Sequence, residues 1–124
     1  MGEKIKLKTD KLLKKFGKKK WIIDCEDRYL EDLLTILQAH GVKWFDEQPI
    51  TPRKTAQKLK YYENYVFEIK RINKQNYLQY NPQEYYPPFH YRTFTFNEFY
   101  NLYREAKMKD TEIILNYCIF GTEI

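Results

Sequence analysis

Four leucines place the strongest constraint on what this chain of 124 residues can fold into. They are spaced i, i+3, i+4 and i+7: Leu30, Leu33, Leu34 and Leu37. This spacing puts all four side chains on one face of an α-helix. Gly41 then ends the helix, because glycine readily takes the left-handed conformation that follows a last turn. Apolar runs flank the helix on both sides, so the sequence predicts a strand–helix–strand unit over residues 21–45.

A hairpin and a second helix are predicted further along the chain. Residues 65–70 alternate apolar and polar side chains, which is typical of a strand with one wet face. Residues 77–80 suit a partner strand, joined to the first by a turn at residues 73–76. Thr95 and Glu98 match a capping box, a hydroxyl and a carboxylate three residues apart, which predicts the start of an amphipathic helix.

The remaining segments are assigned from composition and short patterns. They are an edge strand at residues 4–8, a short helix capped by Thr9 or Asp10 and stopped by Gly17, loops at 46–60 and 81–88, a helix end near Lys109 and an apolar final strand at 112–120. A disordered basic tail is the alternative for the first segment.

Together these elements favour an α+β fold: a small, mostly antiparallel sheet of about five or six strands, with two main helices packed on one face. The length is that of one domain. We expect a basic, partly ordered N-terminal arm at residues 1–20 and a single α+β domain at residues 21–124.

Positive charge is concentrated at the start of the chain. The first twenty residues hold nine lysines against Glu3 and Asp10, a net charge of +7, whereas the remaining residues hold 13 Lys and Arg against 15 Asp and Glu, a net of −2. A basic segment on a near-neutral body predicts contact with a polyanion or an acidic surface, although lysine runs also serve to solubilise a terminus. The candidate residues are Lys4, Lys6, Lys8, Lys11, Lys14, Lys15, Lys18, Lys19 and Lys20, with Arg53 and Lys54 as a second, weaker cluster.

Tyrosine is unusually frequent, with twelve in the chain. Its flat face and polar tip suit stacking on nucleobases as well as anchoring contacts on a protein surface. The candidate anchoring side chains are Tyr77, Tyr80, Tyr85, Tyr86, His90 and Tyr91. The alternative is that this tyrosine- and proline-rich segment packs on its own domain.

Signals for catalysis are weak, and we expect no catalytic residue, metal or cofactor. Cys25 precedes a helix rich in acids, which raise the pKa of a thiol and disfavour a nucleophile. Cys118 lies in an apolar run and is expected in the core, and two cysteines make neither a disulfide scaffold nor a four-ligand zinc site. Glu68 and Lys70, with Asp46 or Glu47 upstream, resemble half of the PD-(D/E)XK nuclease pattern, so a small metal-dependent nuclease is kept as an alternative.

The chain has no stretch that approaches the roughly 20 apolar residues needed to span a bilayer, nor the apolar run of a signal peptide. We therefore expect a cytoplasmic protein without a membrane partner.

Part of the chain resembles small accessory proteins of bacteriophages. The resemblance rests on the apolar start at Trp21, the Leu33-Leu34…Leu37 helix, the Gly41…Trp44 strand and a later Phe94-Thr95…Phe99 segment. Several such proteins are anti-CRISPR or other anti-defence inhibitors. The resemblance implies a non-enzymatic binding protein that inhibits a host nucleic-acid machine, such as a CRISPR effector, in the host cytoplasm.

The expected partner is then a host protein or ribonucleoprotein, and the basic segment implies contact with a guide RNA, with DNA or with an acidic protein face. Many inhibitors of this kind are acidic mimics of DNA, and the basic start of this chain departs from that pattern. A single-stranded RNA- or DNA-binding module is the alternative that uses the same lysines and tyrosines.

Overall fold

The computed structural model describes residues 7–60, 64–82 and 91–120. The helices in this part of the chain are α1 (Lys8–Lys18), the short 3-10 helix η1 (Asp27–Tyr29), α2 (Leu30–Ala39), α3 (Pro52–Leu59) and α4 (Phe96–Phe120). The strands are β1 (Trp21–Glu26), β2 (Lys43–Trp44), β3 (Asn64–Ile72), β4 (Gln75–Pro82) and β5 (Arg92–Thr95). The predicted α+β class and small sheet are confirmed.

The five strands form one sheet in the order β2-β4-β3-β1-β5. The central pairs β1–β3 and β3–β4 are antiparallel, and the edge strands β5 and β2 are added in parallel to β1 and β4. The sheet is therefore mixed, where a mostly antiparallel sheet was expected, because both edge strands arrive through crossovers. The register pairs Phe67 with both Ile23 and Tyr80, and Ile23 with Phe94, so these four side chains share one face.

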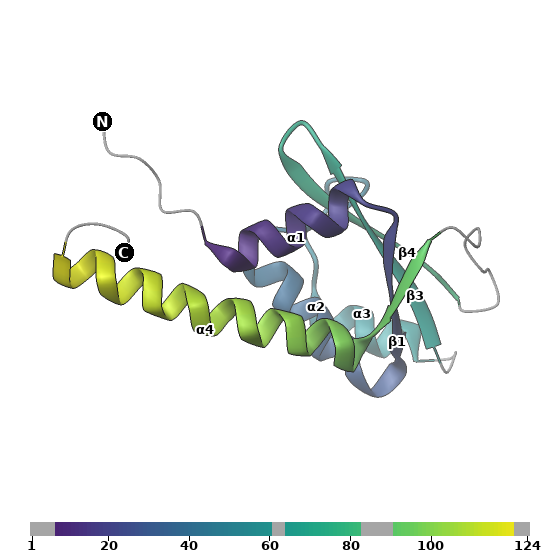
Figure 1. The fold of residues 1–124 in the computed structure, drawn as a ribbon. Coiled ribbons are helices and arrows are strands. Elements are labelled where there is room, and N and C mark those ends of the chain that lie inside the picture. Colours follow the sequence, from purple (N-terminus) through teal and green to yellow (C-terminus); the bar gives the residue numbers. More distant parts are fainter. Residues whose placement is uncertain (1–6, 61–63, 83–90, 121–124) are drawn as a thin grey trace.

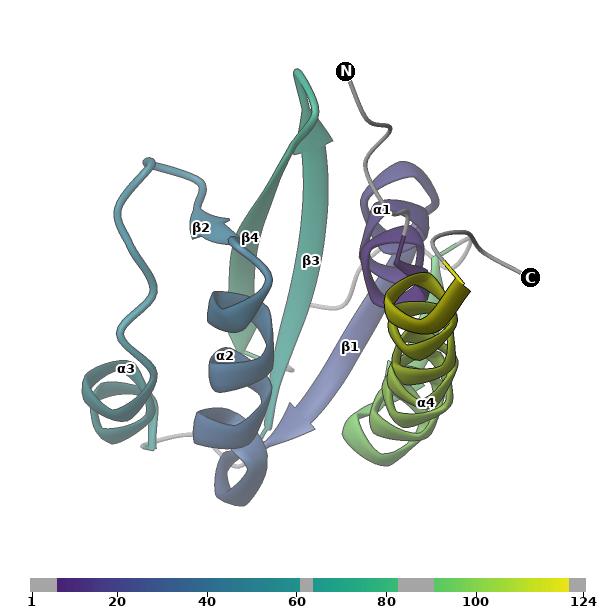
Figure 2. The same cartoon turned by 90° about the vertical axis from the view of Figure 1, so that its left-hand side faces the viewer.

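That face carries the core and is covered by all four α-helices, as Figures 1 and 2 show. Leu13 and Phe16 from α1, Leu33 and Leu34 from α2, and Phe99 from α4 are almost completely buried against it. The other face presents polar side chains such as those of Glu68 and Lys70 on β3. The two main helices expected from the sequence are thus joined by α1 and α3 in one helical layer.

Three local predictions are confirmed in detail. Gly41 takes the left-handed conformation after α2, with φ of 76°. Asn73 and Lys74 both have positive φ, as a two-residue hairpin turn between β3 and β4 requires. Thr95 and Glu98 form the reciprocal bonds of a capping box, each accepting a bond from the other's backbone N–H at 3.1 Å.

Two segments differ from the sequence prediction. Residues 46–60 contain the helix α3, which starts with Pro52 in its first turn and buries Leu59, rather than a continuous loop. Residues 112–120 continue α4 to Phe120 rather than forming a strand. A short apolar run fits a strand or a helix equally well, and here the capped helix continues because no glycine or proline interrupts it.

Helix α1 starts and ends differently from the prediction. Residues 1–6, which include most of the predicted edge strand, lie outside the described residues, and Lys8 is already helical. Gly17 lies inside α1 instead of stopping it. A Cβ atom at Gly17 would stand 2.9 Å from the Cβ of Arg71 on β3, so glycine allows the close approach of α1 to the sheet.

Candidate polyanion-binding surface

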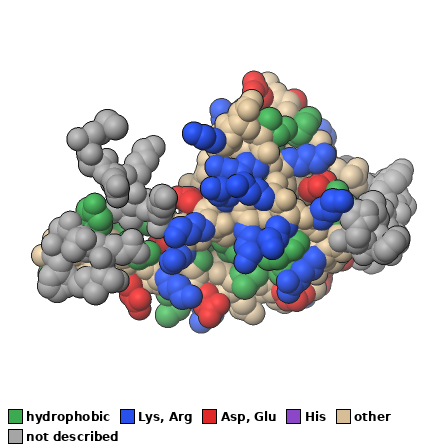
Figure 3. Space-filling view, turned by 45° about the horizontal axis from the view of Figure 1, so that its top comes forward, with side chains coloured by type: hydrophobic (Ala, Val, Ile, Leu, Met, Phe, Trp, Pro, Cys, Tyr) green, Lys and Arg blue, Asp and Glu red, His purple; other side chains and the backbone are tan. Residues whose placement is uncertain are grey.

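Helix α1 turns its apolar residues to the sheet and its lysines to solvent. Leu13 and Phe16 anchor the helix in the core, with Leu12 half-buried beside them. The seven lysines between residues 8 and 20 lie on α1 or in the turn that follows it: Lys8, Lys11, Lys14, Lys15, Lys18, Lys19 and Lys20. All but Lys8 are exposed. Figure 3 shows a band of Lys and Arg side chains crossing this face of the molecule.

A groove of about 220 Å³ separates α1 from α4. Its apolar lining comes from Leu12, Leu102 and Ala106. Four lysines and one carboxylate complete the lining: Lys8, Lys11, Lys15, Lys109 and Glu105. Four ammonium groups against one carboxylate make this groove strongly electropositive, which suits an anion such as a phosphate.

A second concentration of positive charge surrounds Trp21 at the start of β1. The Nζ atoms of Lys15 and Lys19 lie 5.3 and 5.5 Å from the centroid of its indole ring, and the Cζ atom of Arg92 lies 5.2 Å from it. The ring itself is held by Phe16, with the two rings perpendicular at 5.2 Å. Cation–π attraction to the indole ring offsets part of the repulsion among these three positive charges. An anion bound between them would reduce that repulsion further.

Lys15 belongs to both the groove and the Trp21 cluster, so the two are continuous. We call the combined set, the lysines of α1 and its following turn with Arg92 and Lys109, the basic α1 surface. Within the described residues, no carboxylate forms an ion pair with Lys8, Lys11, Lys15, Lys18, Lys19 or Lys20. The acidic residue of α1, Asp10, instead lies 3.6 Å from His40, the C-cap residue of α2, measured from Oδ1 to Nδ1.

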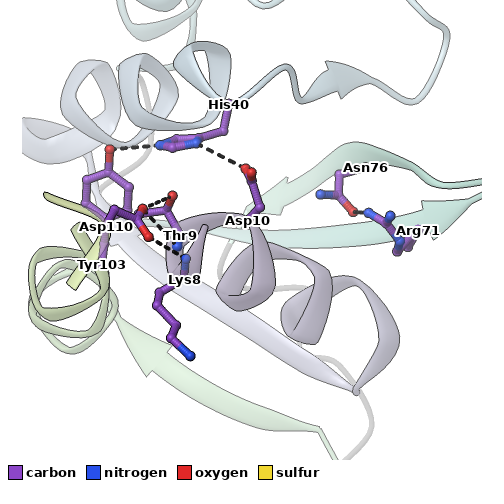
Figure 4. A network of polar contacts seen from close by, with 8 residues as sticks. All are labelled: Lys8, Thr9, Asp10, His40, Arg71, Asn76, Tyr103 and Asp110. Atoms are coloured by element: carbon purple, nitrogen blue, oxygen red, sulfur yellow. Dashed lines mark hydrogen bonds and ion pairs between the residues drawn. The ribbon is translucent and has the colours of Figure 1, made fainter. Parts of the chain in front are cut away.

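The N-terminus of α1 is capped from the far end of the chain (Figure 4). Leu7 occupies the N-cap position and has no capping side chain. The buried carboxylate of Asp110, on α4, accepts hydrogen bonds from the backbone N–H groups of Lys8 and Thr9 and from the Thr9 hydroxyl, the last at 2.6 Å. The cap predicted at Thr9 or Asp10 is therefore supplied by Asp110, whose negative charge also suits the helix N-terminus.

His40 adds a polar link between the helices that support the surface. Its Nε2 atom lies 2.9 Å from the hydroxyl of Tyr103 on α4, and the two rings meet edge to face. Together with the contact to Asp10, this side chain connects α1, α2 and α4 (Figure 4). The orientation of α1 on the domain is thus fixed by polar contacts as well as by its buried face.

The other predicted basic residues lie elsewhere or are not described. Arg53 and Lys54 are exposed on α3, which lies at the opposite side of the helical layer from α1 (Figure 2). Lys4 and Lys6 fall outside the described residues, as do three of the predicted aromatic contacts, Tyr85, Tyr86 and His90.

The described tyrosines of the predicted anchoring set do not share one surface. Tyr77 and Tyr80 lie on opposite faces of β4, because they pair with Lys70 and Phe67 respectively. Tyr80 packs on the core side, against Trp44 at 5.5 Å between ring centroids. Tyr77 donates to Glu47 at 3.3 Å on the polar side. Partial burial and the Glu47 carboxylate raise the pKa of Tyr77, and the negative charge of Glu68 raises that of Tyr91.

The two cysteines occupy contrasting positions. Burial, followed by the nearby charge of Asp24, raises the pKa of the Cys25 thiol to about 12. Its Sγ atom contacts the carbonyl oxygen of Glu26 at 3.4 Å. A thiol of this kind stays protonated near neutral pH, as expected for a packed residue. Cys118 is exposed on α4, which contradicts the prediction of a core position, because the helix extends beyond the body that would cover it (Figure 1).

Glu68 and Lys70 of the nuclease pattern lie on the polar face of the sheet, whereas Asp46 and Glu47 lie in the turn after β2. Glu68 faces the Tyr91 hydroxyl, and the Nζ of Lys70 lies 5.7 Å from the ring centroid of Phe45. In the described residues, no group of three or more His, Cys, Asp or Glu side chains is arranged to hold a metal ion.

Four residues that matter to the basic α1 surface were not singled out from the sequence: Trp21 and Arg92, Lys109, and the capping residue Asp110. Lys109 follows Leu102 at a spacing of i+7, so a helical wheel of α4 places the two on one side. Arg92 and Asp110 act through contacts between distant segments, for which a single sequence carries no signal, whereas Trp21 contacts Lys15 and Lys19 just before it in the chain.

Comparisons with known proteins add nothing to these observations. No family model, curated protein or solved structure matches the chain. Among the described residues, no helix is both long and apolar enough to cross a membrane.

Proposed function

We propose that this protein is a non-enzymatic binding protein that attaches, through the basic α1 surface, to the phosphate backbone of a nucleic acid. The observation that carries the proposal is the sharing of Lys15 between the α1–α4 groove and the cluster on Trp21. This arrangement concentrates cations along a rigid helix that has no carboxylate partner for most of its lysines within the described residues.

The dimensions of α1 suit a phosphate backbone. An α-helix rises 1.5 Å per residue, so the 11 residues of α1 extend for roughly 16 Å. One strand of B-DNA carries a charge about every 3.4 Å along the axis, so several phosphates pass along such a helix. The Trp21 ring is occupied by three cations, which favours contact with phosphates over stacking on bases. Binding is therefore expected to be insensitive to sequence and steeply dependent on salt.

The resemblance to bacteriophage accessory proteins supplies a setting for this activity. In that setting, the basic α1 surface contacts the guide RNA or the DNA held by a host defence nuclease and blocks its work. This inhibitory role remains a prediction, as does the alternative of a free single-strand binding module. Both use the same contact, and they differ in whether a host protein accompanies the nucleic acid.

The test is a binding titration with a matched pair of variants. Fluorescence anisotropy with labelled 20-nucleotide RNA and DNA strands measures affinity over a series of salt concentrations. Replacing Lys11, Lys15 and Lys19 with glutamine is expected to weaken binding about tenfold or more and to reduce the salt slope by about 2. The control replaces Arg53, Lys54 and Lys60 of the α3 region, removes the same charge, and should change affinity by less than about twofold. Equal losses in the two variants would contradict a localised site.

The inhibitory role needs a second measurement. The tagged protein is incubated with host lysate, and captured material is compared with and without treatment by RNase and DNase. A host nuclease that is retained through its nucleic acid, and lost on treatment, supports inhibition through the backbone. Captured nucleic acid without an accompanying protein supports the free binding module.

A further inference from the structure

The edge strand β2 covers a small part of its neighbour β4. β2 has two residues and β4 has eight, and the register ends with Trp44 opposite Leu78. One more ladder bond follows, from the backbone N–H of Phe45 to the carbonyl oxygen of Leu78 at 3.1 Å. The chain then turns away, with Glu47 at a positive φ of 71°. Among the described residues, no strand therefore lies beside the edge of β4 beyond Leu78.

In the described part of the chain, the open edge presents the backbone groups of Tyr80 without a bonded partner. Because the carbonyl of Leu78 points toward β2, alternation along the strand turns the N–H and C=O of Tyr80 to the same edge. Tyr80 is then in a non-hydrogen-bonded pair with Phe67 of β3. No described backbone group bonds to this N–H or C=O. An unpaired donor and acceptor in extended geometry form a template for another strand.

A groove of about 600 Å³ runs beside this edge. On the sheet side it is lined by Leu78 and by Tyr80, whose ring packs on Trp44. Thr55 and Lys58 of α3 line it as well. The groove therefore joins an open strand edge to an apolar and aromatic surface with a helix beside it, the combination that strand-adding peptide sites use.

We propose that this β4-edge groove binds an extended peptide of a partner protein, which adds to the sheet as a strand beside Tyr80. The N–H and C=O of Tyr80 lie in strand geometry, so an extended backbone that pairs as a further strand satisfies both. Alternate side chains of the peptide point into the groove, so an apolar residue next to Trp44 and Tyr80 is the expected signature. The site is lined by α3, which lies at the opposite side of the helical layer from α1 (Figure 2), and it is independent of the nucleic-acid proposal.

The probe is a phage-displayed library of random 12-residue peptides, selected on the immobilised full chain. An enriched peptide is synthesised, and its affinity is measured by calorimetry. Amide exchange, followed by NMR, is expected to slow by tenfold or more at Tyr80 when the peptide binds. Methylating the peptide nitrogen that faces Tyr80 is expected to weaken binding by tenfold or more.

Two variants on one helix locate the site. Lys58→Trp places a large side chain in the groove and is expected to weaken peptide binding at least tenfold. Lys54→Trp makes the same change at an exposed position that does not line the groove, and is expected to stay within twofold. Thermal melting of both variants checks that the fold is kept. The proposal is overturned if no peptide is enriched over the bare support. It is also overturned if enriched peptides bind the Lys58→Trp variant as tightly as the original chain and leave the amide exchange rate of Tyr80 unchanged.

Discussion

Helices α1 and α3 are alike in sequence character and differ in surroundings. Both are short, both turn an apolar side to the core, and both present basic side chains to solvent, lysines on α1 and Arg53, Lys54 and Lys58 on α3. The cations of α1 meet a second helix across a groove and gather on Trp21. Beneath the cations of α3, by contrast, none of the described aromatic rings is found within cation–π range. The comparison teaches that tertiary contacts, and not only the number of lysines in a segment, decide where positive charge is concentrated.

The largest expected difference between the two helices lies in their caps. Replacing Asp110 with alanine removes the acceptor for three donors at the start of α1 and should lower the free energy of unfolding by about 2–3 kcal/mol. The matched change is Thr51→Ala at the N-cap of α3, where the threonine side chain makes no capping bond. It should lower the free energy of unfolding by less than about 0.5 kcal/mol. Urea denaturation measures both. Similar costs would mean that α1 does not depend on its distant cap.

A transplant of charge tests the role of clustering directly. The starting variant replaces Lys11 and Lys15 with glutamine, and a second version adds Thr51→Lys and Gln57→Lys on α3, which restores the net charge. We expect oligonucleotide affinity to fall about fivefold or more in the first and to stay low in the second, since the restored cations lie away from the groove. Recovery of affinity would show that net charge alone governs binding.

A finer test compares two lysines within α1. Lys15 lines the groove and contacts Trp21, whereas Lys18 is exposed and has neither contact. Lys15→Gln is expected to weaken oligonucleotide binding about threefold to fivefold, and Lys18→Gln by less than twofold. Anisotropy titrations at one low salt concentration resolve this difference. If Lys18→Gln weakened binding more than Lys15→Gln, the contact with the oligonucleotide would lie nearer the C-terminal end of α1.

Thiol labelling then shows whether variants of either helix alter the fold. The pKa of Cys25 is raised from 9.0 to about 12, so its contribution to stability is complete below pH 9 and is lost as the pH rises toward 12. Ellman's reagent at pH 8 is expected to modify Cys118 rapidly and to leave Cys25 unmodified until the chain unfolds. A fast reaction of both thiols in an α1 or α3 variant would reveal a general loss of packing.

Local patterns allowed much of the fold to be predicted. The spacing of the leucines from Leu30 to Leu37 predicted α2, and the alternation of apolar and polar side chains predicted the β3–β4 hairpin. The capping box of Thr95 and Glu98 predicted the start of α4. These features depend on residues close together in the chain. By contrast, α3 carries little apolar periodicity, and the apolar end of α4 fits a strand equally well by composition. Their states depend on the surrounding structure.

The candidate site could be predicted in part for the same reason. The lysines of α1 were evident as a charge run, and their outward direction follows from the burial of Leu13 and Phe16. Their convergence with Arg92 and Lys109 depends on the pairing of β5 with β1 and of α1 with α4, which join segments about 70 to 100 residues apart. Contacts of this range leave no periodicity in one sequence. Tyr77 and Tyr80, two of the predicted anchoring tyrosines, lie on opposite faces of β4 because side chains alternate along a strand.

The bond between Asp110 and Thr9 has a consequence for how the protein is made. A ribosome releases the lysine-rich segment first and the capping carboxylate about one hundred residues later. A helix of 11 residues is only marginally stable by itself in water. The nascent segment is therefore expected to leave the ribosome, beside ribosomal RNA, as a positively charged chain without stable helical structure. Its cations take up their final spacing only after α4 has been made, so assembly of the basic α1 surface waits for the synthesis of α4.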